Sequence, residues 1–484
     1  MAAVAAVGLF GLASLRAAQL SLTHDEAHTY LHHVLSPVQR IIRFDTGGFV
    51  DNNHLLNTLG AKLATSVFGE REWAIRLPAL SGYALFLAAT LGLLRRHLGG
   101  PMLMVAFLAI AAHPYLMDFF SIARGYSLGL GFMALALWLW NRWLVQSIPI
   151  HRSSNAWGAG LAMLMASLAN LSFLLPTAAA ILSAATLAMQ HRERGWMRTF
   201  AGISTYVAGT LGAALVVNLV PLNRIHEKDL FNIGGRQGFL ADTVTSLFQN
   251  TLPFRVDEAV LHLVSAHIVI GIMVWAAYVL RFPNPPNGRQ GTREFLLFMW
   301  LFTIAMAFGS IVQTRLFAVA YLTDRRALFL VPAFLIITFL TIDRTLSRGR
   351  RKSGLVAALL AITIALPYVP QYNLTHYRDW RYDAETDEIM RTVSERLEGT
   401  HRAGSGSIGV NWILEPSVNY YLRRYGIDEL GAADRRGLRE GQDFYIEHLD
   451  RENEVKKRFN VEIIGRYPLA GMLLAAPVGK RPEP

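Results

Sequence analysis

The sequence contains no cysteine among its 484 residues. A disulfide framework, a thiolate nucleophile and a cysteine-based metal site are therefore excluded. Charged residues are also scarce, at 17% of the chain, whereas ordinary soluble domains contain about a quarter. Hydrophobic residues make up 52%, and the mean hydropathy is +0.30. This composition favours a protein embedded in a membrane.

Long apolar runs are abundant in the part of the chain before residue 371. A helix needs about 20 apolar residues to cross the bilayer core, and the sequence predicts about eleven such spans. The first run lacks the basic start and the clear cleavage site of a signal peptide, so we expect it to be retained. The predicted spans are 2–20, 74–94, 101–117, 126–145, 156–172, 173–190, 199–220, 259–280, 294–313, 326–342 and 354–370.

Positive charge is distributed unevenly between the loops. The net charge is +11, and Lys and Arg concentrate in alternate short loops. Such loops face the cytoplasm, which explains the charge without nucleic-acid binding. The N-terminus is then cytoplasmic in a multi-pass plasma-membrane protein, and the segments 21–73, 221–258 and 371–484 lie outside. The basic set comprises Arg95, Arg96, Arg142, Arg152, Arg192, Arg194, Arg198, Arg281, Arg289, Arg293, Arg344, Arg348, Arg350, Arg351 and Lys352.

The tail after residue 370 is polar and mixed in charge. Segment 383–397 predicts an amphipathic helix with an acidic first turn. Four segments with strand-like patterns follow, at 407–414, 443–449, 461–467 and 471–478. We therefore expect a transmembrane domain over 1–370 and a small extracytoplasmic α/β domain over 371–484, whose function the sequence does not indicate.

The first outer segment carries adjacent carboxylates, Asp25 and Glu26. Thr23 and Glu26 match a capping box, which gives Glu26 a structural alternative to catalysis. Cytoplasmic nucleotides cannot reach this side of the membrane, so an activated substrate must arrive on a carrier such as a lipid.

Four motifs occur in order: "DEAHTY" (25–30), "NNHLLNTL" (52–59), "FGEREWAIRLP" (68–78) and "MDFFSIARGYSLGLGF" (117–132). This series resembles the C-type glycosyltransferase superfamily, in particular the branch with protein O-mannosyltransferases and the lipid A aminoarabinose transferase. The resemblance implies transfer of a hexosyl or pentosyl group from a polyprenyl-phosphate donor to an extracytoplasmic glycan, lipid or protein. It also implies that Asp25 is the catalytic carboxylate, with Glu26 as a further candidate.

Such a transfer needs a base for the acceptor hydroxyl and a cationic clamp for the departing phosphate. A single displacement would invert the anomeric centre. Arg124, Arg325 and Arg326 are candidates for the clamp because they lie in outer loops, against the general bias. The alternative is that they anchor the ends of spans at the outer headgroups.

Further polar residues of the same motifs are candidate substrate ligands. They are Asn52, Asn53, His54, Asp118 and Tyr126. Asp118 is equally well explained as a surface acid at headgroup level. The sequence departs from many relatives, which have "HPPL" or "KPPL" where this chain has 53–56, and a Glu where this chain has Ile122.

The histidines near Asp25 raise the alternative of a divalent metal. His24 and His28 have the four-residue spacing of ligands on one helix face, but the "HExxH" pattern is missing. We therefore expect no definite cofactor and keep His24 and His28 as weak metal candidates.

Two other functions stay open. A ligase or polymerase with a lipid-pyrophosphate donor should need more cationic residues near the phosphate. A transporter should place ionisable residues at mid-span, and His113, His262 and His267 there lack acidic partners in the sequence. The clustering of acids outside the spans favours an enzyme.

Overall fold

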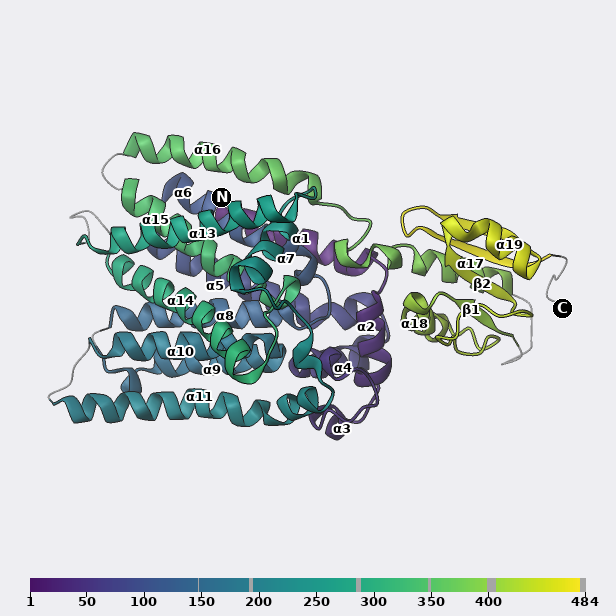
Figure 1. Ribbon diagram of the computed structural model, residues 1–484, viewed down its shortest axis with the longest axis horizontal. Coiled ribbons are helices and arrows are strands. Elements are labelled where there is room, and N and C mark those ends of the chain that lie inside the picture. The colour runs from purple at the N-terminus through teal and green to yellow at the C-terminus, as the bar shows by residue number, and fades with distance from the viewer. Residues whose placement is uncertain (147, 191–194, 284–288, 347–349, 398–405, 479–484) are drawn as a thin grey trace.

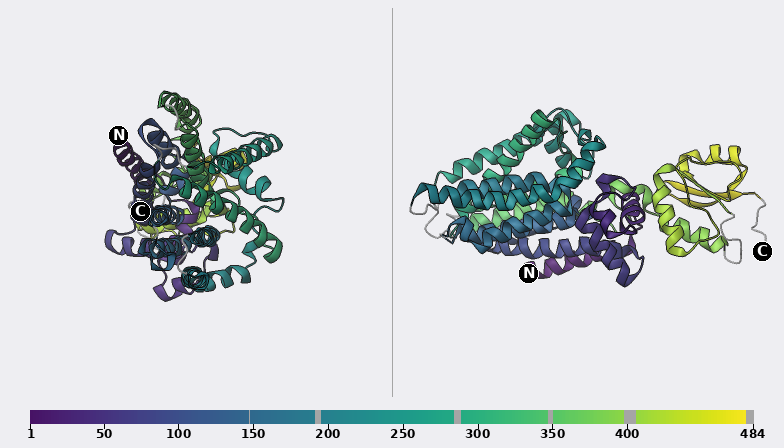
Figure 2. Two further views of the ribbon diagram at one scale, coloured as in Figure 1. Left: turned by 90° about the vertical axis from the view of Figure 1, so that its left-hand side faces the viewer. Right: turned by 90° about the horizontal axis from the view of Figure 1, so that it is seen from below.

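The protein forms a helical bundle with a smaller α/β lobe at one end (Figure 1). The computed structural model describes residues 1–146, 148–190, 195–283, 289–346, 350–397 and 406–478. The view from below shows the lobe standing beyond the end of the bundle (Figure 2, right).

Each predicted span corresponds to a helix, and the span 101–117 to two helices with a 59° bend between them. These helices are α1 (Ala2–Gln19), α5 (Glu72–His97), α6 (Gly100–Ala111), α7 (Pro114–Phe120), α8 (Tyr126–Leu144), α9 (Ser154–Ala169), α10 (Leu174–Ala188), α11 (Trp196–Glu227), α13 (Glu258–Leu280), α14 (Thr292–Phe317), α15 (Leu330–Leu346) and α16 (Arg350–Tyr368).

The number of these helices that can cross a membrane is smaller than predicted. Within the described residues, seven spans are long and apolar enough, or eight if the bent pair α6–α7 counts as one. Helices α9 and α15 have 16 and 17 residues, so each is about 25 Å long, short of the hydrocarbon core of about 30 Å. The count of eleven therefore stays a prediction.

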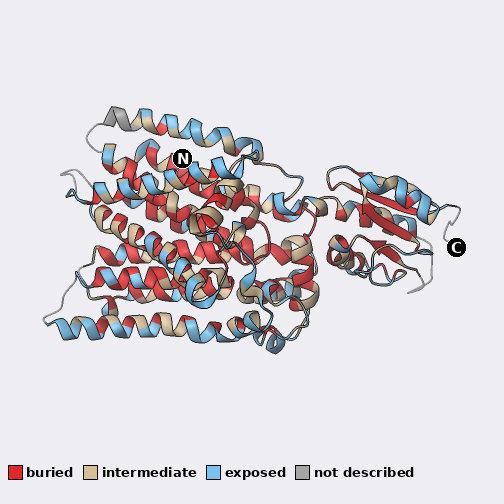
Figure 3. Ribbon diagram, viewed as in Figure 1, coloured by how far each residue is buried: buried red, intermediate tan, exposed pale blue. Residues whose placement is uncertain are grey.

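Burial separates central from peripheral helices. The apolar window of α5 is 67% buried, whereas that of α16 is 11% buried. Exposed residues recur along α11, α13 and α16 (Figure 3), and many of them are Leu, Ile or Val. Such wide apolar surfaces suit contact with lipid.

Two basic residues at the end of the bundle away from the lobe bind backbone carbonyl groups. Arg289 donates to the carbonyl oxygens of Arg95 and Leu98, at 2.5 and 2.6 Å. Arg344 donates to that of Phe282 at 2.6 Å. Arg192, Arg194 and Arg348 lie outside the described residues. The predicted cytoplasmic orientation of this end stays a prediction.

Short helices cover the opposite end of the bundle. The first outer segment forms α2 (His24–His28), the π-helix η1 (Thr29–Val34), α3 (Val38–Ile42) and α4 (Leu55–Phe68). The second contributes α12 (Thr245–Thr251), and the 3₁₀ turns η7 (Asp324–Ala327) and η9 (Arg378–Asp383) lie at the same end.

The tail has the helix and the four strands that the sequence predicts. They are α17 (Thr386–Leu397), β1 (Ile408–Val410), β2 (Phe444–His448), β3 (Val461–Tyr467) and β4 (Met472–Pro477), with α18 (Glu415–Tyr425) and α19 (Glu452–Phe459) between strands. The sheet order is β1-β2-β4-β3; β1 and β2 are parallel, and the other pairs are antiparallel.

The tail shares a hydrophobic core with the first outer segment. Leu22, Ala27 and Tyr30 belong to the same buried cluster as Tyr420 and Tyr421 of α18. The backbone N–H of Leu22 donates to the hydroxyl of Tyr421 at 2.8 Å. The lobe is thus packed onto the loop that carries Asp25 and Glu26. The predicted domain boundary at residue 371 stays a prediction.

Candidate active site

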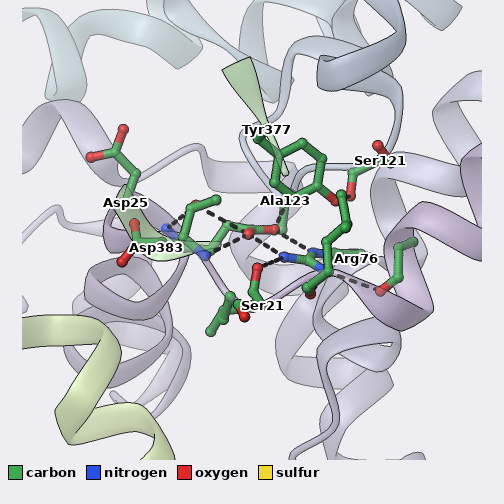
Figure 4. A network of polar contacts seen from close by, with 12 residues as sticks. Ser21, Asp25, Arg76, Ser121, Ala123, Tyr377 and Asp383 are labelled. Carbon is green, nitrogen blue, oxygen red and sulfur yellow. Dashed lines mark hydrogen bonds and ion pairs between the residues drawn. The ribbon is translucent and has the colours of Figure 1, made fainter. Parts of the chain in front are cut away.

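Glu26 lies at the centre of a closed hydrogen-bond network, and Figure 4 labels its partners Arg76 and Ala123. Thr23 and Glu26 form the predicted capping box at the start of α2, so this expectation is confirmed. Arg76 of α5 binds both oxygens of Glu26, at 2.9 and 2.7 Å, and the backbone N–H of Ala123 adds a bond of 2.8 Å. The side chains of Arg76 and Glu26 are fully buried.

The same arginine caps the end of α1. Arg76 donates to the carbonyl oxygens of Ala17, Leu20 and Ser21, at 3.1, 2.7 and 2.8 Å. Carbonyl groups at a helix C-terminus have no partner inside the helix, so this contact satisfies acceptors that would otherwise be buried and unpaired. Arg76 also lies over the ring of Tyr377, 5.2 Å from its centroid.

This placement does not support the candidate catalytic role of Glu26. Burial raises its pKa, but Arg76 and the hydrogen bonds from Ala123 and Thr23 outweigh burial, so the pKa lies below its ordinary value. A buried carboxylate with donors on both oxygens cannot reach a substrate without breaking the network. Glu26 therefore joins α1, α2 and α5 at the end of the bundle that carries the lobe.

Asp25 points away from this network (Figure 4). Its Oδ2 lies 3.4 Å from Nη2 of Arg124 and 3.5 Å from Nη2 of Arg325. The side chain of Asp25 is 15% exposed, and that of Arg325 is 32% exposed. The structure thus brings Asp25, Arg124 and Arg325 together from three distant segments, with access to solvent.

Opposing effects set the pKa of Asp25. Burial raises it, but Arg124 and Arg325 oppose burial, assisted by His24 and by a hydrogen bond from Asn52. The result is a pKa below the ordinary value of an aspartate. Asp25 is therefore ionised at neutral pH and able to accept a proton.

Backbone geometry at Gly125 places Arg124. Gly125 has a φ of +71°, and a Cβ there would lie 2.1 Å from the carbonyl oxygen of Ala169 and 2.9 Å from Cβ of His54. Only glycine allows this approach. Arg124 Nη1 then donates to Oδ1 of Asn52 at 2.6 Å. The "ARGY" and "NNH" motifs therefore meet in space.

Arg325 is held by contacts around its neighbour Asp324. Asp324 adopts a φ of +50°, an unfavourable conformation for a residue with a side chain. Its backbone N–H donates to Ser246 at 2.9 Å, and its Oδ1 accepts from Asn250 at 2.8 Å. The guanidinium of Arg325 lies over the ring of Trp380, 5.1 Å from its centroid.

The site contains buried polar atoms without a partner. Among the described residues, neither Nε of Arg124 nor Nε2 of His54 has a hydrogen-bond partner. Burial lowers the pKa of His54 well below its ordinary value, as does Arg124, so the ring is neutral. The ring of His54 lies 5.9 Å from that of Tyr126. Unsatisfied buried groups are costly and commonly mark a place where a ligand binds.

Three other candidates are used elsewhere. Arg326 donates to the carbonyl oxygen of Ile233 in the second outer segment. Asp118 accepts from Arg16 of α1 at 2.5 Å and from the backbone N–H of Arg378 at 3.1 Å. Asn53 donates to the carbonyl oxygen of Ile41 at 2.9 Å. Each of these three side chains binds another part of the chain. None of them contacts Asp25 in the structure.

The two histidine metal candidates point to different surroundings. The Nδ1 of His24 lies 2.6 Å from the carbonyl oxygen of Ile413, whereas Nε2 of His28 accepts from the backbone N–H of Phe49 at 3.0 Å. Within the described part of the chain, no group of three or more His, Asp or Glu side chains is arranged to hold a metal. His24 and His28 therefore do not form a shared ligand pair.

Two residues near Asp25 and Arg325 were not predicted from the sequence, because they lie in the tail. Trp380 packs on Arg325, and Asp379 interacts electrostatically with Arg325 and Asp25. Burial raises the pKa of Asp379, although Arg325 and Arg378 oppose this effect. The charged and aromatic run "RDWRYD" (378–383) was the only sequence signal.

Comparisons with known proteins give a likeness of fold. No family model matches the chain, and no curated protein matches it. The crystal structure of ArnT from Cupriavidus metallidurans bound to undecaprenyl phosphate matches with a TM-score of 0.53 and 15% identity, covering 100% of this chain and 98% of that one. The chain therefore has the fold of this C-type glycosyltransferase, which confirms the predicted resemblance at the level of fold.

Two further structures match with TM-scores below 0.5. They are ArnT from the same organism in the apo state (0.42, 15% identity, 100% of each chain) and an Archaeoglobus fulgidus oligosaccharyltransferase with Zn and sulfate (0.40, 11% identity, 96% of this chain and 70% of that one).

Proposed function

We propose that this chain is a membrane glycosyltransferase that moves a hexosyl or pentosyl group from a polyprenyl-phosphate donor to an acceptor hydroxyl outside the cytoplasm. The observation that carries the proposal is the accessible pairing of Asp25 with Arg124 and Arg325 at the outer end of the bundle. The fold shared with ArnT, which binds undecaprenyl phosphate in its crystal structure, supports a donor of this kind.

In the proposed reaction, the acceptor oxygen forms a bond to the anomeric carbon as the bond from that carbon to the phosphate oxygen breaks. The hydroxyl proton passes to Asp25. The polyprenyl phosphate leaves with the bonding electron pair, and Arg124 and Arg325 stabilise its charge. This single displacement inverts the anomeric centre.

Donor binding would itself strengthen the base. Burial raises the pKa of Asp25, and the two arginines hold it down. A phosphate that takes up the guanidinium groups would weaken this opposition, so the pKa of Asp25 would rise and its affinity for the acceptor proton would increase. Asp25 thus becomes a better base when the donor is in place.

The number of arginines favours a monophosphate over a pyrophosphate donor. Two guanidinium groups, from Arg124 and Arg325, match one phosphate group in charge and in hydrogen-bond donors. A pyrophosphate would carry more charge into the same partly buried site, and Arg326, the neighbouring candidate, is bound to Ile233.

The proposal is tested by mass spectrometry of envelope glycans from cells with and without the gene. We expect one sugar substituent to disappear without the gene and to return when the wild-type gene is restored. A gene encoding Asp25→Asn should not restore it. Identical envelope glycans with and without the gene, or full restoration by Asp25→Asn, would overturn the proposal.

A further inference from the structure

A cavity in the α/β lobe lies apart from the Asp25 cluster. Its volume is about 320 Å³, within the range of small-molecule sites. Four arginines line it: Arg435, Arg436, Arg451 and Arg458. None of them belongs to the Asp25 cluster.

The topology of the sheet explains where this cavity forms. Strands β1 and β2 are parallel neighbours, so their carboxyl ends meet at one edge of the sheet. Asn411 and Trp412 follow β1, Arg451 follows β2, and α19 closes the side with Arg458. Ligands of open α/β sheets commonly bind at the carboxyl ends of parallel strands.

The charge of the lining favours an anion. The lining contains two acids, Glu447 and Glu454, and one of its four arginines, Arg435, is paired with Glu415 at 3.1 Å. Glu447 is already engaged, because Asn411 donates to it at 2.7 Å and Arg451 lies 3.8 Å away. Guanidinium groups bind phosphate and carboxylate through paired hydrogen bonds.

Two of the arginines retain donors for a ligand. The nearest carboxylate to Arg436 is that of Asp434, at 3.8 Å, and the Arg436 side chain is 78% exposed. Arg458 lies over the ring of Phe459, 5.0 Å from its centroid, and forms no ion pair among the described residues. Both side chains can therefore turn to a bound anion without losing a buried contact.

An exposed indole stands beside these charges. The side chain of Trp412 lines the cavity, and the residue is 56% exposed. A large aromatic ring with hydrogen-bonding side chains around it suits a sugar, whose C–H face packs on the ring while its hydroxyl groups meet Asn and Arg. The lining thus combines features for an anion with features for a carbohydrate.

The rim of the cavity contacts the loop that carries Asp25. The rings of His24 and Trp412 meet edge to face, with centroids 6.5 Å apart. Arg435 lies over the ring of Phe49 at 5.3 Å. A chain of sugar units held in the cavity would therefore run beside the first outer segment.

We propose that this cavity binds an acidic glycan, that is, sugar units that carry a phosphate or a carboxylate group. The inference concerns binding alone and goes beyond the transfer reaction, so it stands or falls independently of Asp25.

Isothermal titration calorimetry of the full-length protein in detergent tests the inference. The probes are a hexuronate-containing tetrasaccharide, a phosphorylated tetrasaccharide and a neutral tetrasaccharide. We expect saturable binding of at least one acidic probe, and which one binds identifies the anionic group. The double replacement Arg436→Ala and Arg458→Ala should weaken this binding at least tenfold, about 1.4 kcal/mol.

Matched variants separate the cavity from the rest of the surface. Trp412→Ala should weaken binding severalfold, and Trp412→Phe should restore it. Arg396→Ala on α17 and Trp196→Ala at the start of α11 replace exposed residues outside the cavity and should bind like wild type. Asp25→Asn should also bind like wild type, which distinguishes this inference from the proposed function.

Three results would overturn the inference. They are the absence of saturable binding of both acidic probes, equal affinity for the neutral probe, and unchanged affinity in the double arginine variant.

Discussion

Asp25 and Glu26 are neighbours in α2, and each forms a cluster with arginine side chains. The two clusters differ in how many hydrogen bonds the carboxylate accepts. Glu26 is inaccessible to solvent and accepts from Arg76, Ala123 and Thr23. Asp25 is 15% exposed and contacts Arg124 and Arg325 only at 3.4 and 3.5 Å. Adjacent residues on a helix point in different directions, so one carboxylate faces the core and the other is partly exposed to solvent. A closed network stabilises the fold, whereas an open one leaves capacity for a substrate.

The energetic consequences differ in the same way. Removing one partner of a buried ion pair costs about 3–5 kcal/mol, because the remaining charge is left buried without compensation. The contacts of Asp25 are longer and reach solvent, so an incoming phosphate can replace them at little cost.

Asp25→Asn should abolish most of the activity and leave the fold intact. A general base contributes about 10²–10⁴-fold to a rate, and we expect kcat to fall by this factor. The measurement is sugar transfer from a polyprenyl-phosphate donor by the purified protein. Thermal unfolding of the variant serves as the control and should change less than that of Glu26→Gln. A variant with wild-type kcat would remove Asp25 from the chemistry.

Glu26→Gln should have the opposite profile. The neutral amide leaves Arg76 buried and uncompensated, so stability should fall by about 3–5 kcal/mol. The measurement is denaturant-induced unfolding of the detergent-solubilised protein, with Asp25→Asn as the matched control. Wild-type stability with lost transfer would mean that the two carboxylates have exchanged their assigned roles.

Arg325→Ala and Arg124→Ala should weaken donor binding, each by about tenfold, because each removes charge-assisted hydrogen bonds to the phosphate. Arg326→Ala is the matched control, since its guanidinium binds Ile233. Equilibrium binding of a polyprenyl phosphate measures the effect. If Arg326→Ala weakened binding more than Arg325→Ala, the assignment of the clamp would be wrong.

The pH dependence should shift on donor binding. In the free enzyme the pKa of Asp25 lies below its ordinary value, so kcat/KM should fall only in strong acid. With the arginines engaged by phosphate, the pKa rises, so the acidic limb of kcat should lie at higher pH. Profiles of both constants measure the difference. If the acidic limbs of kcat and kcat/KM coincided, donor binding would not change the interaction of Arg124 and Arg325 with Asp25.

Local patterns predicted much of this structure. Hydrophobic runs located the helices, short strand-like segments located the strands of the tail, and Thr23 with Glu26 gave the capping box. Arg124 and the pair Arg325 and Arg326 were predicted to lie near Asp25 because they are basic residues in outer loops. These features depend on residues that are close in sequence or on a resemblance that orders the motifs.

The remaining assignments depended on partners far along the chain. The sequence does not reveal that Arg76 reaches Glu26 or that Arg16 reaches Asp118. It also cannot distinguish Arg325 from Arg326, because a turn decides which of two neighbours faces the site. Trp380 comes from the tail, whose packing onto the bundle has no local signature.

The most direct test of the open cluster is a structure of Asp25→Asn with a polyprenyl-phosphate sugar bound. This variant should retain the donor without transferring its sugar. We predict the phosphate within hydrogen-bond distance of Arg124 and Arg325, with the anomeric carbon facing residue 25. A phosphate bound elsewhere, with both arginines still turned to residue 25, would contradict the account.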